Sequence, residues 1–303
     1  MKNTRRDRSQ SETVDGSIGK RRSAAPTRSL LAATTLWAFA CTAAAADFSL
    51  GGKVVHVPAP SGFVKVTPEM DGVYRMSLQV ADPINDQLGF YIAEADAANA
   101  RKGDATQLER TFGLKVHKQL REVLMGSNEF QSMTRDLKEE NKRVFDEVKA
   151  KASEEIRKTS KGISKEFDIE FAMQVSDVTP LDPHHEEAFS FAYSMYINYA
   201  IETVGIDERM MVAATSTVIN ASGKVLFLYC YAPKDQLEWT RTASKEWAAA
   251  ILAVNPPPPL LPGGLRGGSG DEFLEKMVIG AVVFGVIGLA ISLRHRRKKG
   301  PVI

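Results

Sequence analysis

Alternating apolar and polar residues predict a series of β-strands in the second half of the chain. Every second residue is apolar over residues 167–175 and again over residues 189–197, which is the pattern of strands with one buried face. Two further apolar runs, 210–219 and 224–231, are separated by the small residues 220–223, a connection of hairpin length. Because connections this short exclude a parallel crossover, we expect antiparallel neighbours. Earlier strands are expected at residues 53–57, 63–66, 88–95 and 110–120.

Other stretches have the three- and four-residue periodicity of helices. Thr67 followed by Pro68 is a helix-starting pair and predicts a helix over residues 68–81. The longest helix is expected over residues 127–159, where a narrow apolar stripe lies among charged residues. We expect this helix to pack on one side of the sheet, and a projecting coiled-coil arm is the alternative.

A last helix is expected over residues 234–254, with Trp247 and Ile251 facing the sheet. Helices therefore come before, within and after the antiparallel strands. This order predicts an α+β fold class, in which an antiparallel sheet packs with helices.

The first 46 residues have the pattern of a signal peptide. Eight basic and three acidic side chains are concentrated before an uncharged run at 29–46. The densely apolar part of that run is too short to cross a hydrocarbon core of about 30 Å as a helix. Ala44 and Ala46 have the A-x-A spacing that predicts cleavage after Ala46. Two alternatives stay open: the run is retained as an uncleaved signal anchor, or the chain is lipidated at Cys41.

Residues 277–293 contain no charged side chain, and Phe273 and Leu274 extend this apolar stretch. At about 1.5 Å per residue it is about 25 Å long, which suits a short membrane-spanning helix. A basic cluster follows at once and stays cytoplasmic under the positive-inside rule. We therefore expect a single-pass protein of a bacterial inner membrane, with its main domain in the periplasm. Ala281 and Gly285 form a small-xxx-small step, which permits a homodimer through close helix pairing.

Four prolines followed by a glycine-rich stretch separate the domain from the anchor and predict a short tether. The expected organisation has five parts. They are a signal peptide at 1–46, a periplasmic α+β domain at 47–255, a Pro/Gly-rich linker at 256–272, a transmembrane helix at 273–293 and a basic cytoplasmic tail at 294–303.

The small total charge conceals an acidic central domain. The whole chain carries +2, yet the leader has five more basic than acidic residues and the segment from Pro256 onward has four more, which leaves −7 for residues 47–255. An acidic domain lacks the basic face that nucleic-acid binding needs, so we expect no nucleic-acid partner. If Cys41 leaves with the leader, Cys230 remains without a partner for an internal disulfide.

Two segments resemble a known family. VPAPSGFVKV near the start of the domain and KVLFLYCYAPKDQLEWTRTASKEWAAAILAV at its end resemble the first and last elements of PsbP/Mog1-like domains. The resemblance implies a final strand that leads into a helix packed on the sheet, and it leaves the long central helix unexplained. In layout the chain is also similar to bacterial exported proteins with one terminal anchor. These likenesses bear on fold more than on function.

Catalytic motifs are missing from the sequence, and the catalytic residues stay unknown. His184, His185, Glu186 and Glu187 form the one cluster with metal-ligand chemistry. Adjacent residues point apart, so we expect a solvated loop there, and we expect no metal and no cofactor. Cys230 lies in an apolar strand, where a small buried thiol is more ordinary than a nucleophile.

Two functions are compatible with these patterns. The tether, the single anchor and the missing catalytic motifs favour a membrane-tethered, non-catalytic binding or accessory module of the bacterial cell envelope. Its partners would be the membrane and an envelope protein. The alternative is an envelope hydrolase whose site is assembled from residues far apart in the sequence.

Overall fold

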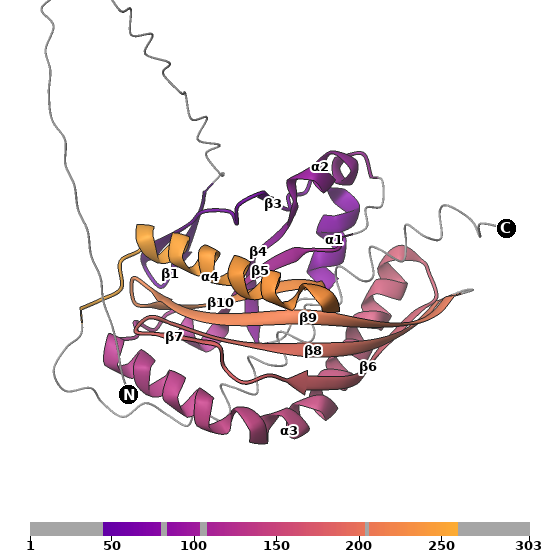
Figure 1. Cartoon of the computed structure of the whole chain (residues 1–303). Coiled ribbons are helices and arrows are strands. Elements are labelled where there is room, and N and C mark those ends of the chain that lie inside the picture. Colours follow the sequence, from indigo (N-terminus) through magenta and orange to yellow (C-terminus); the bar gives the residue numbers. More distant parts are fainter. Residues whose placement is uncertain (1–44, 80–83, 104–107, 204–205, 260–303) are drawn as a thin grey trace, which may run out of the picture. The chain divides into compact units, whose positions relative to one another are not determined.

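The computed structural model describes residues 45–79, 84–103, 108–203 and 206–259 of the chain (Figure 1). Its strands are β1 (Ala46–Leu50), β2 (Lys53–Val57), β3 (Phe63–Lys65), β4 (Asn85–Ala93), β5 (Thr111–His117), β6 (Phe171–Pro180), β7 (His185–Glu187), β8 (Ser190–Thr203), β9 (Ile206–Ala221) and β10 (Lys224–Pro233). Its helices are α1 (Asp71–Gln79), α2 (Glu94–Arg101), α3 (Ser127–Phe167) and α4 (Leu237–Val254), with short 3-10 turns η1 (Lys118–Leu120) and η2 (Lys234–Gln236).

The described strands form two sheets. The large sheet has the order β3-β4-β5-β10-β9-β8-β6, with β7 paired to β8 beside this path, and β1 pairs with β2 in a separate hairpin. Each pairing among these strands is antiparallel. The described part of the chain is therefore a mixed fold of antiparallel sheets and helices, as the alternation and the short connections predict.

Helices cover both faces of the large sheet. The face that carries the apolar side chains of β8 packs against α1 and α3, where Phe130, Leu137 and Ile156 are fully buried. The other face packs against α4 and the β1–β2 hairpin, and Trp247 and Ile251 contribute to that core as predicted. Figure 1 shows α4 and α3 on opposite sides of the sheet. The long helix therefore packs on the sheet, and the alternative of a projecting arm is wrong.

The junction between α3 and β6 differs from the sequence prediction. Phe167 belongs to the helix, and the strand begins at Phe171. Asp168 ends the helix in a left-handed conformation with a φ of 49°. Ser164 then holds the next strand, because its hydroxyl donates to the Phe171 carbonyl at 2.9 Å and accepts from the Phe171 amide at 3.2 Å. The apolar alternation begins before the helix has ended.

Several other boundaries differ from the prediction. The long helix runs to Phe167 rather than to 159, and β8 continues to Thr203 rather than ending at 197. The strand expected to reach Ala95 ends at Ala93, and α2 follows without a loop. Its alanine-rich sequence has high helix propensity, and Glu94 and Asp96 occupy the first turn, where acidic side chains are favourable. The helix expected from Pro68 begins at Asp71, after a turn.

Within the described ranges no helix is long and apolar enough to cross a bilayer. The transmembrane helix expected at 273–293, the tail at 294–303 and the pairing step at Ala281 and Gly285 lie outside the described residues. So does the signal peptide expected at 1–46, apart from its last two residues.

Candidate functional site

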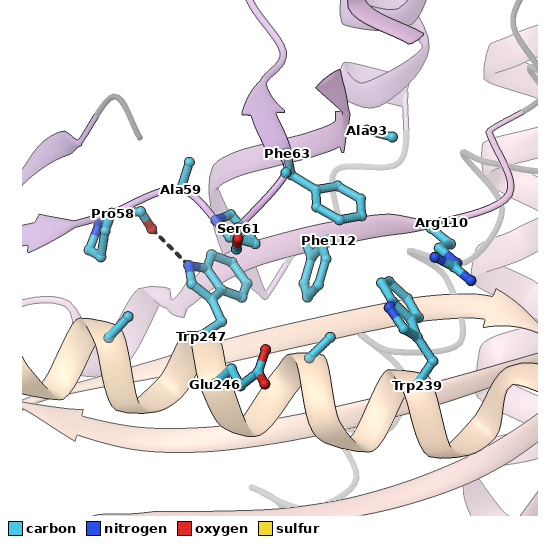
Figure 2. Close-up of a pocket in the computed structure, with 14 residues that line it drawn as sticks. Pro58, Ala59, Ser61, Phe63, Ala93, Arg110, Phe112, Trp239, Glu246 and Trp247 are labelled. Carbon is cyan, nitrogen blue, oxygen red and sulfur yellow. Dashed lines mark hydrogen bonds between the residues drawn. The ribbon is translucent and has the colours of Figure 1, made fainter. Parts of the chain in front are cut away.

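A pocket of about 650 Å³ lies between α4 and the segment that joins β2 to β3 (Figure 2). The end of β4 and the residues at the start of β5 complete its lining. This volume is in the range of sites that hold small organic ligands or the anchoring side chains of a peptide.

Aromatic rings form the wall of the pocket. The Phe112 ring lies 4.7 Å from the ring of Phe63, 5.8 Å from that of Trp239 and 5.3 Å from that of Trp247, all between centroids and all edge to face. Phe112 and Trp247 are buried, whereas Phe63 and Trp239 are partly exposed. The two buried rings therefore support two others that a ligand can reach.

The β2–β3 segment is held in place by hydrogen bonds to its backbone carbonyl groups. The indole nitrogen of Trp247 donates to the Pro58 carbonyl at 2.8 Å, a bond that joins the segment to α4. The Phe63 amide donates to the Pro60 carbonyl at 3.0 Å and closes a tight turn. Gly62 has a φ of +77°, which favours glycine. Proline and these bonds restrict the segment before any ligand binds, so the pocket is pre-formed.

Two charged side chains border the aromatic wall. The Arg110 guanidinium lies 4.4 Å from the centroid of the Trp239 ring, and its Nε donates to Gln236 Oε1 at 2.6 Å. This stacking holds a cation beside an apolar surface. Glu246 contributes an exposed carboxylate from α4. Among the described lining residues none is histidine or cysteine.

The side chains of residues 184–187 have partners both inside and outside this cluster, and inside it His185 Nε2 lies 3.6 Å from Glu187 Oε1. The His184 ring nitrogen lies 3.4 Å from the Ser194 hydroxyl, and His185 lies 2.8 Å from that of Ser190. Glu186 pairs with Lys138 at 2.6 Å, outside the histidine pair. In the ranges that the structure describes, no group of three histidine, cysteine or carboxylate side chains is arranged to hold a metal ion. Residues 185–187 also form β7, so part of the expected loop is a strand.

The surroundings of His184 keep its ring neutral. Burial lowers the pKa of His184 to about 4, and the positive charge of Arg241 and the neighbouring His185 act in the same direction. Arg241 also donates from Nε to the Ser194 hydroxyl at 3.3 Å. These groups join β8 to α4 and lie outside the pocket lining.

Cys230 is fully buried in β10, as the sequence predicts. Burial raises the pKa of its thiol, which keeps it protonated and poorly nucleophilic. Its side chain belongs to the core on the α4 side of the sheet.

Comparison with known proteins gives a distant structural likeness and no family match. A scan against protein-family models finds no match, and a search of curated proteins finds none. Among solved structures, the chain is similar to the solution structure of cyanobacterial PsbP (CyanoP) from Synechocystis sp. PCC 6803. The identity is 10%, the TM-score is 0.26, and the match covers 69% of this chain and 91% of that chain. A TM-score this low supports no conclusion about fold or function.

Proposed function

We propose that this chain is a membrane-tethered, non-catalytic binding module of the bacterial cell envelope, and that the aromatic pocket is its ligand site. The observation that carries the proposal is the pre-formed aromatic wall with Arg110 stacked on Trp239. A pre-formed site lowers the ordering cost that binding has to overcome. The resemblance of the sequence to PsbP/Mog1-like domains is compatible with such a module. It does not indicate which ligand the pocket binds.

The chemistry of the lining indicates the ligand class. Phe63 and Trp239 offer partly exposed rings to an apolar body. Arg110 is exposed and positively charged beside those rings, so it favours an anionic group on the same ligand. We therefore propose a ligand with an apolar or aromatic body and a carboxylate-like anion, either a small molecule or an acidic peptide of an envelope protein.

The alternative function of a hydrolase gains no support from the described lining. A nucleophile needs a base within hydrogen-bonding reach, and Ser61 in the pocket has no lining histidine beside it. His184 and Cys230 lie outside the pocket lining, and Cys230 is sealed in the core. No observation on these residues favours the hydrolase over the binding module.

The ligand site can be tested by fluorine NMR, because the chain has only three tryptophans. The full chain, labelled with 5-fluorotryptophan and placed in nanodiscs, is titrated with 2-naphthoate as the probe. We expect a saturable shift of the Trp239 resonance, assigned with Trp239→Phe. Arg110→Gln should weaken binding about tenfold, or about 1.4 kcal/mol, because the anionic group loses its charged partner.

Arg209→Gln is the matched control, since Arg209 is an exposed arginine on β9 outside the pocket lining. It should leave the affinity for naphthoate unchanged. Naphthalene-2-carboxamide, which has the same rings and no charge, should bind the wild-type chain as weakly as naphthoate binds the Arg110→Gln variant. A Trp239 resonance that does not respond, or equal losses in the two arginine variants, would reject the pocket as the ligand site.

The tether can be tested by fractionation of bacterial membranes. We expect the full chain to stay in the pellet after an alkaline carbonate wash, and protease added to spheroplasts to digest the domain. Val286→Arg places a charge near the centre of the apolar stretch, at a cost of about 3 kcal/mol. It should release the chain from the pellet. If the variant stays in the pellet, the segment 273–293 is not the anchor.

A further inference from the structure

Large apolar side chains exposed to solvent gather at one end of the domain. Six such side chains occur among the described residues: Val54, Leu78, Val123, Leu124, Met211 and Val254. Val54 lies in β2, and Val254 is the last residue of α4. Val123 and Leu124 lie in the segment between η1 and α3. Figure 1 shows the β9–β10 turn, the start of α3 and the end of α4 at the same end of the domain, with α1 away from it.

Hydrogen bonds join these segments into one surface. Lys224 is fully buried and donates from Nζ to the carbonyls of Arg121 at 2.8 Å and Val123 at 3.0 Å. The Met125 amide donates to the Gly223 carbonyl at 2.8 Å. The segment that carries Val123 and Leu124 is therefore fixed to the β9–β10 turn, and its exposed side chains are held in position. We call the four residues Val54, Val123, Leu124 and Val254 the linker-end patch.

The chain leaves the domain beside this patch. The Asn255 side chain donates to the His56 carbonyl at 2.6 Å, which fixes the end of α4 to β2. The Ser222 hydroxyl donates to the Pro256 carbonyl at 3.3 Å, and that of Ser127 donates to the Pro258 carbonyl at 2.5 Å. The last described residues therefore run across the end of the domain that exposes the patch.

The proposed anchor begins a short distance further along the sequence. Residues 260–272 separate the described domain from the apolar stretch that starts at Phe273. For a chain of this length, random-coil statistics give an average end-to-end distance of about 20 Å. Fully extended, it reaches about 45 Å. The linker therefore keeps the end of the domain that carries the patch within about 45 Å of the proposed anchor.

We propose that the linker-end patch docks on the lipid surface of the membrane that anchors the chain, with Val123 and Leu124 inserted at the headgroup level. This inference rests on the proposed function, because the membrane tether brings the patch to the bilayer. Apolar side chains at the boundary of headgroups and acyl chains lose contact with water. Docking would fix the orientation of the domain relative to the membrane and leave the binding pocket at a fixed height above it.

The test uses a fluorescent reporter of lipid contact in the full chain. Leu124→Cys and Leu78→Cys are each made in a Cys41→Ser background, labelled with an NBD maleimide and reconstituted in nanodiscs of phosphatidylcholine and phosphatidylglycerol. Leu78 is the matched control, since its side chain is 50% exposed against 56% for Leu124 and it lies on α1. Doxyl-labelled phosphatidylcholine should quench the reporter at residue 124 at least about threefold more than at residue 78, because quenching requires contact with the lipid. An NBD label at Val254→Cys should be quenched to about the same extent as the label at residue 124.

Three other outcomes would overturn the inference. Equal quenching at residues 124 and 78 would mean that the domain meets the membrane without a preferred end. A lack of quenching at residue 124, in a chain that stays bound to the nanodiscs, would reject docking and leave the tether intact. A chain that does not stay with the nanodiscs would reject the tether of the proposed function, and the docking with it.

Discussion

Replacing Trp247 with alanine is expected to lower the free energy of unfolding by about 3–5 kcal/mol. The side chain is 2% exposed, and its ring packs edge to face on Tyr91 and Phe112, each at 5.3 Å between centroids. Its indole nitrogen also holds the Pro58 carbonyl. Alanine would leave a cavity between α4 and the sheet and release the β2–β3 segment. Urea denaturation of the full chain in mild detergent, followed by near-ultraviolet circular dichroism, measures the loss.

Trp239→Ala is the control, because it removes the same side chain from the same helix at a partly exposed position. The expected cost is about 1–2 kcal/mol, since less apolar surface leaves a buried environment. Trp247→Phe keeps most of the ring and loses the hydrogen bond, for a cost of about 1 kcal/mol from the bond itself. Similar losses for the two alanine variants would contradict the assignment of Trp247 as the support of the pocket.

The order and direction of the later strands could be predicted from the sequence, because their alternation and short connections are local signals. The structure pairs β6 with β8, β8 with β9 and β9 with β10, all antiparallel. The β9–β10 connection is shorter than expected: Asn220 and Ala221 remain paired in β9, and the turn is Ser222-Gly223, both with positive φ. Two-residue turns of this kind match the strand twist, and serine in this conformation is not a strong sequence signal.

The helix-covered face of the sheet could not be predicted from alternation alone. In β8 the polar residues that alternate with the aromatic ones indicate a solvent face, yet Ser194 is fully buried. It lies beneath α4 and bonds Thr215 at 2.9 Å, which in turn bonds Thr240 of the helix at 2.8 Å. Small hydroxyl side chains on the sheet allow a helix to pack closely against it. They also form hydrogen bonds with hydroxyl groups of the helix. A polar row that faces such a helix looks the same in the sequence as one that faces water.

The pocket escaped prediction because its parts are far apart in the chain. Pro58 and Trp247 are separated by 189 positions and meet through one hydrogen bond. Two signals could have indicated it. Trp239 and Trp247 lie on the same amphipathic helix, and only the second is needed for the core. The segments VPAPSG and LEWTRTASKEW, which carry the family resemblance, are the two that face each other across the pocket.

Gly51→Ala is expected to destabilise the domain by about 3 kcal/mol, because both the backbone and the space around it require glycine. Gly51 has a φ of +51°, which costs a side chain about 1 kcal/mol. An added Cβ would lie 2.8 Å from the Glu122 Cα and 2.9 Å from the Arg121 carbonyl oxygen. These are backbone atoms, and they can move only if the η1–α3 segment moves. The Lys224 ammonium, 2.5 Å from the same Cβ, would also be pushed from its carbonyl partners.

Gly52→Ala is a closely matched control, since its φ of +74° is also left-handed and an added Cβ would meet nothing within 4 Å. Its expected cost is about 1 kcal/mol from the backbone alone. Urea denaturation measures the free energy of unfolding of both variants. The conformational cost is common to both, so the difference between them is the steric cost of Gly51→Ala. Because the steric cost displaces the segment that carries Val123 and Leu124, Gly51→Ala should also weaken lipid quenching at residue 124, and Gly52→Ala should not. Equal destabilisation by the two variants would show that the β1–β2 turn does not support that segment.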